Sequence, residues 1–170
     1  YFALREISVD RVSGIPRLCL NGEPYLFNGL LDQGYYPDGI FLPATSEGYL
    51  YDIKLTKSMG FNTLRKHIKI EPQIFYYLCD KHGVAVFQDM VNNSGYSFFL
   101  DTVLPTVGLK SAPDNMRHRN PEARNIFRSH SLRTVEYLHS HPSVLYYTVF
   151  NEGWGQFLAD ENYELIKEAD

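Results

Sequence analysis

The sequence predicts an α/β fold with about four βα units arranged as in a (β/α)8 TIM barrel, preceded by a short β-hairpin. Three observations lead to this prediction. Short apolar runs alternate with segments of helix length, which indicates parallel βαβ units. No glycine-rich phosphate-binding sequence follows any apolar run, which disfavours a doubly wound nucleotide-binding sheet. Each apolar run ends in polar residues, and in a barrel such residues converge on one face.

The composition is typical of a folded domain. Of the 170 residues, 44% are hydrophobic and 15% are aromatic. The formal net charge of −4, without any run of Lys or Arg, gives no electrostatic reason to bind nucleic acid or a membrane surface. Cys19 and Cys79 lack metal-ligand spacing, and we expect both to be buried free thiols. We expect neither a metal nor an organic cofactor.

The first 24 residues are expected to form the leading hairpin. Asn21-Gly22 lies between two β-prone runs and is a strong signal for a type I′ turn. From Tyr25 onward the pattern changes to strand, loop and helix. The expected strands are 25–31, 61–65, 84–87 and 144–150, and the expected helices are 46–59, 72–82, 121–140 and 160–168. Asp160 is expected to cap the last helix.

Polar residues end each expected strand. They are Asp32 after the first strand, Arg65 and His67 after the second, Gln88 and Asp89 after the third, and Asn151 and Glu152 after the fourth. The loops that follow are long and aromatic: residues 33–43 include Tyr35, and residues 90–119 are about thirty in number, whereas the helix-to-strand links are short. This asymmetry indicates a binding face at the carboxyl ends of the strands.

Glu152 is the candidate catalytic residue. A strand-end Glu is more often a cap or a solvated charge, but Asn151 precedes it and Trp154 follows it. An amide can bind a sugar hydroxyl, and an indole can stack on a sugar ring or raise the pKa of a nearby carboxyl group by desolvation. Arg65 has a simpler interpretation as a strand-end salt bridge with Asp32 or Asp89.

Two other candidate residues also have structural explanations. His67 is equally well explained as a satisfied polar residue or as a sugar contact, and Asp89 could serve only to tie down the long loop.

Four segments in order resemble glycoside hydrolase family 2, the β-galactosidase and β-glucuronidase family. They are Asn21-Gly22-Glu-Pro-Tyr25 leading to Asn28-Gly29, Gly60-Phe-Asn-Thr-Leu-Arg65, Leu78-Cys-Asp-Lys-His-Gly83, and His141-Pro-Ser-Val144 through Asn151-Glu152-Gly153-Trp154. The resemblance implies Glu152 as acid/base, Asn151 as a partner of the sugar 2-hydroxyl, and Arg65 as a charge partner of the nucleophile. Their places at the strand ends and in the following loops make His67, Asp32, Asp89, Trp154 and Tyr35 further candidate substrate contacts.

The sequence departs from the family pattern in two places. Where many relatives carry Ser-His-Tyr-Pro after the arginine, this chain has Lys66-His67-Ile68-Lys69. The family's nucleophile, a second Glu, lies on the seventh strand, so we expect it beyond residue 170. We therefore expect a half-barrel from a longer enzyme, with residues 1–24 as the junction from a preceding sandwich domain and residues 25–170 as the first half of the catalytic barrel.

The expected activity of the longer enzyme is hydrolysis of β-O-glycosidic bonds in carbohydrates with retention of configuration. Two alternatives stay open: a non-catalytic carbohydrate-binding or interaction module, and an inverting hydrolase that uses Glu152 with Asp89 as its base. We expect the isolated 170 residues to be inactive and to self-associate through exposed barrel edges.

Overall fold

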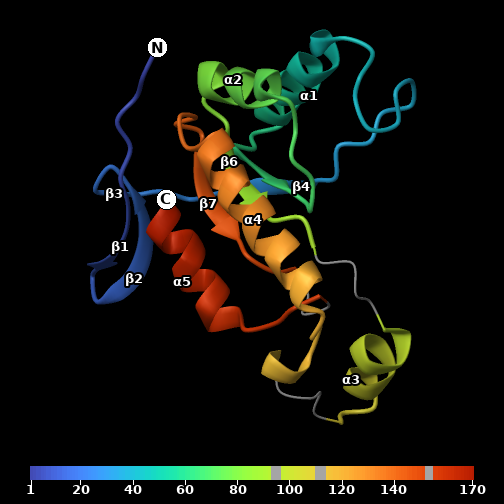
Figure 1. Ribbon diagram of the computed structural model, residues 1–170. Coiled ribbons are helices and arrows are strands. Elements are labelled where there is room, and N and C mark those ends of the chain that lie inside the picture. The colour runs from blue at the N-terminus through green and yellow to red at the C-terminus, as the bar shows by residue number, and fades with distance from the viewer. Residues whose placement is uncertain (93–96, 110–113, 152–154) are drawn as a thin grey trace. The chain divides into compact units, whose positions relative to one another are not determined.

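A computed structural model describes residues 1–92, 97–109, 114–151 and 155–170 (Figure 1). The chain forms two compact units, each described here by itself. The first comprises Tyr1–His67, Glu71–Gln88 and Leu138–Tyr146, and the second comprises Ile68–Ile70, Asp89–Tyr137 and Tyr147–Asp170.

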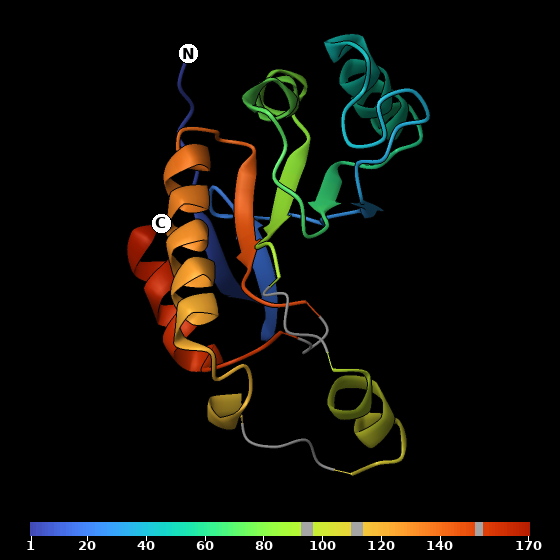
Figure 2. The ribbon, with the colours of Figure 1, turned by 45° about the vertical axis from the view of Figure 1, so that its right-hand side comes forward.

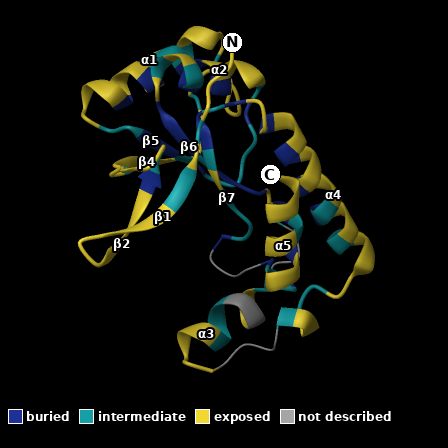
Figure 3. Cartoon of the chain, turned by 90° about the vertical axis from the view of Figure 1, so that its left-hand side faces the viewer, coloured by how far each residue is buried: buried dark blue, intermediate teal, exposed yellow. Residues whose placement is uncertain are grey.

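The first unit begins with a three-stranded antiparallel sheet in the order β1 (Ile7–Val12), β2 (Ile15–Leu20) and β3 (Glu23–Pro24). Asn21 and Gly22 have φ angles of 52° and 79°, as a type I′ turn requires, so the turn predicted there is present. A second turn of this kind, at Ser13 and Gly14 with φ angles of 53° and 80°, joins β1 to β2 and was not singled out from the sequence. Figure 3 shows most of this hairpin as exposed.

The parallel strands predicted from the sequence are present as one four-stranded sheet. Its order is β4 (Gly29–Asp32), β5 (Thr63–Lys66), β6 (Ala85–Asp89) and β7 (Val144–Thr148). Both β4 and β5 begin later than expected, and before them a side-chain amide joins the two segments beside one backbone hydrogen bond, from the Asn62 N–H to the Asn28 carbonyl at 2.9 Å. Asn62 accepts a hydrogen bond from the Asn28 backbone N–H at 2.8 Å and donates one to the Leu26 carbonyl at 2.8 Å.

Two helices of the first unit lie side by side over the sheet (Figures 1 and 2). These are α1 (Ser46–Ser58) and α2 (Gln73–His82). Gly60 follows α1 with a φ of 87°, and Gly83 caps α2 with a φ of 65°, both in the left-handed region where glycine carries no Cβ penalty. Pro72 is the residue before α2 rather than part of its first turn.

The second unit contains most of α4 (Pro121–Leu138) and all of α5 (Ala159–Ala169). The prediction that Asp160 caps α5 is wrong, because Asp160 lies inside the helix and Leu158 is the cap residue, with a φ of 43°. The capping hydrogen bond comes from a distant residue instead, since the Asp114 carboxylate accepts the Ala159 N–H at 2.7 Å. None of the described helices is both long and apolar enough to cross a bilayer.

The segment expected to be a long irregular loop contains short helical pieces. These are a π-helical turn at Phe98–Val103, α3 at Leu104–Thr106 and a 3-10 turn at Asp114–Met116. The core of the second unit is formed by Met90, Phe127, Val135, Phe157 and Ile166. Both cysteines are buried free thiols, as expected.

Candidate active site

Strand register divides the residues at the carboxyl ends of β4, β5 and β6 between the two faces of the sheet. Leu31 pairs with Arg65, which pairs with Phe87, and the next row is Asp32, Lys66 and Gln88. Because side chains alternate along a strand, each row shares one face and the two rows lie on opposite faces. Contacts with α1 and α2 identify the face of the second row as the helix side.

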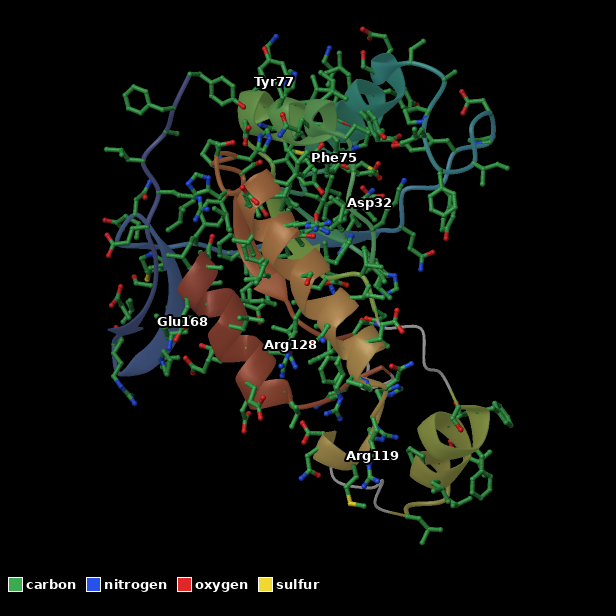
Figure 4. The ribbon with its side chains drawn as sticks, viewed as in Figure 1. Asp32, Phe75, Tyr77, Arg119, Arg128 and Glu168 are labelled. Carbon is green, nitrogen blue, oxygen red and sulfur yellow. The ribbon has the colours of Figure 1, made fainter. Side chains whose placement is uncertain are left out.

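A buried ionic cluster occupies the helix side. The Lys66 ammonium lies 2.5 Å from Oε1 of Glu71 and 3.0 Å from Oδ2 of Asp32. The Lys66 and Glu71 side chains are fully buried. Tyr49 of α1 donates its hydroxyl to Oε2 of Glu71 at 2.8 Å, and the Lys66 nitrogen lies 4.9 Å from the centre of the Phe75 ring of α2. Asp32 and Phe75 are labelled in Figure 4.

Tyrosines extend this cluster. The Tyr76 hydroxyl donates to Oε1 of Gln88 at 2.6 Å and accepts the Glu71 backbone N–H at 3.1 Å. Burial, followed by the hydrogen bond to Glu71, raises the pKa of Tyr49. Burial and the nearby Asp52 carboxylate likewise raise the pKa of Tyr36. Tyr36 and Tyr49 therefore stay neutral at physiological pH and act as hydrogen-bond donors.

The Asp32 carboxylate has a partner for each oxygen. Its Oδ2 contacts the Lys66 ammonium, and its Oδ1 accepts the Gly34 backbone N–H at 2.8 Å. The side chain retains 23% exposure. These contacts tie Asp32 to the neighbouring strand and to its own following loop.

The opposite face of the sheet is aromatic. The Phe87 ring lies 5.1 Å from that of Phe27 and 5.4 Å from that of Tyr146. Arg65 belongs to the same row as Phe87 and is half-buried. In a closed barrel this is the interior face, from which side chains at the carboxyl end reach the catalytic face.

His67 lies directly after β5. Its backbone N–H donates to the Asp32 carbonyl at 2.9 Å, which continues the strand pairing by one residue. Its Nδ1 is 3.4 Å from Nε2 of Gln33 in the loop after β4. Ile68 follows with a φ of 54°, a left-handed conformation that is rare for a β-branched residue.

The loop after β4 is fixed by internal hydrogen bonds. Asp38 accepts the backbone N–H groups of Gly39 at 2.9 Å and Ala44 at 3.0 Å, and such backbone hydrogen bonds lower the pKa of its carboxyl group. Tyr36 and Ile40 exchange two backbone hydrogen bonds of 2.9 Å. Tyr35 is 63% exposed on this loop, its ring 5.6 Å from that of Phe41.

The remaining predicted site residues belong to the second unit. Asp89 and Asn151 are buried. Glu152 and Trp154 lie outside the described residues. The chain on either side of them is anchored by packing, because Phe150 and Phe157 both contact Phe127, with ring centres 4.9 Å and 5.5 Å away.

Sequence reasoning missed the cluster around Lys66. The signals were present, since a lysine stands at the end of an apolar strand and Glu71 precedes a proline at a helix start. Among the described residues, no three His, Cys, Asp or Glu side chains come together as a metal site requires.

Comparisons with known proteins give the family. The profile of glycosyl hydrolases family 2, TIM barrel domain, matches residues 17–170. A β-galactosidase of Pseudoalteromonas haloplanktis is 27% identical over 144 residues, which is 85% of this chain and 12% of that protein. A β-galactosidase of Leuconostoc mesenteroides is 26% identical over 159 residues, 90% of this chain and 13% of that protein.

Solved structures share the fold. A family 2 β-galacturonidase from Eisenbergiella tayi, bound to galacturonate, superposes with a TM-score of 0.76 at 20% identity, covering 99% of this chain and 27% of that one. This chain thus spans only a small part of the proteins it resembles. The profile match, which covers most of the chain, and the parallel sheet with its leading hairpin agree: the chain belongs to glycosyl hydrolases family 2 and carries part of its TIM barrel domain.

Proposed function

We propose that the enzyme to which this barrel domain contributes hydrolyses β-O-glycosidic bonds with retention of configuration, and that Glu152 is its acid/base. Glu152 protonates the leaving oxygen while a second carboxylate, about 5–5.5 Å away, attacks the anomeric carbon. Glu152 then removes a proton from the water that hydrolyses the glycosyl-enzyme. We assign the attacking carboxylate to the barrel strands that follow residue 170.

One observation carries this proposal. Asn151 lies three residues after Thr148, the last residue of β7, which is the fourth parallel strand of a family 2 barrel domain, and Glu152 is the next residue in the sequence. Catalytic residues of such barrels come from the carboxyl ends of strands. The packing of Phe150 and Phe157 against Phe127 supports the proposal, because it fixes the chain shortly before and after Glu152.

We propose several sugar contacts for the same reaction. Asn151 binds the 2-hydroxyl, Arg65 pairs with the attacking carboxylate, and Tyr35 and Trp154 offer ring faces to the sugar. His67 and Asp89 supply polar contacts. For Asp32, whose two oxygens contact Lys66 and the Gly34 N–H, we propose a supporting role instead of a direct one.

The substrate is proposed as a class, a β-glycoside. The names of the similar proteins include β-galactosidase and β-galacturonidase, and a β-glucuronidase of Bacteroides uniformis superposes with a TM-score of 0.68 at 19% identity. We also propose that residues 1–24 form the junction to a preceding domain and that residues 25–170 form the first half of the barrel.

Replacing Glu152 by Gln in the enzyme tests the acid/base assignment. Gln keeps the shape but cannot transfer a proton, a contribution typically of about 10²–10⁴-fold in rate. The exposed Glu168, labelled in Figure 4, is the matched control, and Glu168→Gln should leave kcat unchanged. An unchanged kcat for Glu152→Gln on unactivated glycosides would contradict the assignment and give the acid/base role to another residue, whereas absence of turnover in the wild-type enzyme would favour a non-catalytic carbohydrate-binding module.

A further inference from the structure

The segment from Lys66 to Glu71 combines a buried ion pair with a strained residue. Ile68 has a φ of 54°, and a bulky β-branched side chain in the left-handed region persists only where the surroundings hold it. Such strain is concentrated at functional sites. Ile68 directly follows His67, so the strained backbone sets the direction in which the chain leaves that side chain.

The ion pair brackets the strained residue. Lys66 and Glu71 lie on either side of it in sequence, their side chains are fully buried, and their charged atoms are 2.5 Å apart. Removing one partner of a buried pair is strongly unfavourable, so the pair resists separation of the two ends of this turn. The Asp32 carboxylate, 3.0 Å from the same ammonium, joins the end of β4 to this pair. We call Asp32, Lys66 and Glu71 together the clamp.

The clamp joins the two loops that present Gln33 and His67. Their side chains meet at 3.4 Å between Nε2 of Gln33 and Nδ1 of His67. An amide nitrogen can only donate, so this contact requires His67 to accept at Nδ1. A neutral His67 then carries its proton on Nε2, at the opposite side of the ring from Gln33. The contact therefore favours the Nε2-protonated tautomer and one orientation of the ring.

We propose that Lys66 is a positioning residue of the sugar site and that Gln33 is the partner that sets the orientation of His67. His67 then donates from Nε2 to a sugar oxygen. The inference rests on the proposed glycosidase function, and it assigns a role to the buried pair of Lys66 and Glu71.

Steady-state kinetics of the full-length enzyme on one β-glycoside tests this inference. Gln33→Ala and His67→Ala should each lower kcat/KM by about tenfold, the contribution of one hydrogen bond, with the melting temperature unchanged. The double variant should lose no more than His67→Ala alone, because Gln33 acts only through His67. Glu164→Gln, an exposed member of a surface pair with Lys167, is the control and should match the wild type.

The role of Lys66 is tested with variants that keep buried charges balanced. Lys66→Met combined with Asp32→Asn and Glu71→Gln leaves no unpaired charge, and we expect a folded protein with about a tenfold lower kcat/KM. Adding His67→Ala should cause no further loss. If the triple variant does not fold, Asp32→Asn alone is measured instead, because it keeps the Lys66–Glu71 pair. Its decrease in kcat/KM should also be non-additive with that of His67→Ala.

Additive decreases in kcat/KM in these combinations would overturn the positioning role. Wild-type kcat/KM in the folded triple variant or in Asp32→Asn would overturn it as well. Failure of the underlying function has a different signature, because the wild-type enzyme itself would then hydrolyse no β-glycoside and Glu152→Gln would change nothing.

Discussion

Nδ1 of His141 lies 2.6 Å from Oδ2 of Asp80, and both side chains are buried. Asp80 belongs to α2, whereas His141 lies in the turn before β7, so the pair joins segments 61 residues apart in the chain. The other oxygen of Asp80 accepts the Ser143 backbone N–H at 2.9 Å. One carboxylate thus fixes the start of the strand that leads to Asn151 and Glu152.

Replacing Asp80 by Ala should destabilise the protein by about 2–4 kcal/mol, because it leaves the His141 ring and the Ser143 N–H buried without their acceptor. Urea unfolding measures the change, with the exposed Asp170→Ala as control. A loss of less than about 0.5 kcal/mol would show that the pair contributes little to stability.

Tyr1 reports on the same carboxylate through its ionisation. Its hydroxyl donates to Oδ2 of Asp80 at 2.5 Å, and this hydrogen bond, followed by burial, raises the pKa of Tyr1 from 10.0 to about 12. The contribution of this hydrogen bond to the stability of the fold is therefore present below pH 10 and is lost as the pH rises through about 12. An ultraviolet titration of the wild type minus that of Tyr1→Phe should show this late phenolate. Ionisation near pH 10 would mean that the contact is absent in solution.

Gly48→Ala should be destabilising although Gly48 lies in α1. Alanine normally favours a helix over glycine by about 1 kcal/mol. Here a Cβ at residue 48 would lie 2.5 Å from Cβ of Pro43, a rigid ring atom, and overpacking typically costs about 1–3 kcal/mol. The steric clash should outweigh the helix preference of alanine, so the melting temperature should fall. In the Pro43→Gly background the same Gly48→Ala change should cost less, and equal costs in both backgrounds would refute the clash.

A polypeptide of these 170 residues should be inactive on aryl β-glycosides and should self-associate. In the described part of the chain β4 and β7 each have one strand neighbour, and Leu31 and Tyr146 on the aromatic face are 56% and 55% exposed. Analytical ultracentrifugation should detect dimers or larger species that Leu31→Ser with Tyr146→Ser weakens. A stable inactive monomer would contradict self-association alone, whereas robust turnover abolished by Glu152→Gln would place the second carboxylate within this chain.

The order of the fold could be predicted from the sequence because it depends on local patterns. Apolar runs, the Asn21-Gly22 turn and Gly60 and Gly83 after the first two helices are all visible in short windows. The cap of α5 could not be predicted, because Asp114 supplies it from 45 residues away. The short helical pieces between Met90 and Arg119 also escaped prediction.

The residue types at the strand ends of the candidate site could be read from the sequence. The face of the sheet that each side chain occupies could not. Asp32 and Arg65 both end strands, yet the observed register places them in different rows of the sheet. A shift of one residue in strand pairing exchanges the faces, and sequence alone does not fix that register. The partners of Lys66 were hidden for a similar reason, since Asp32 lies 34 residues away and the contact depends on packing between sheet and helices.

The configuration of the first-formed product tests the central claim most directly. Proton NMR of the full-length enzyme acting on an aryl β-glycoside should show the β-anomer of the free sugar first, with the α-anomer appearing later by mutarotation, because a retaining mechanism passes through a glycosyl-enzyme. First appearance of the α-anomer would contradict the account. Glu152 would then act as the acid of an inverting hydrolase, with Asp89 as the candidate base and a carboxyl separation of about 6.5–9.5 Å.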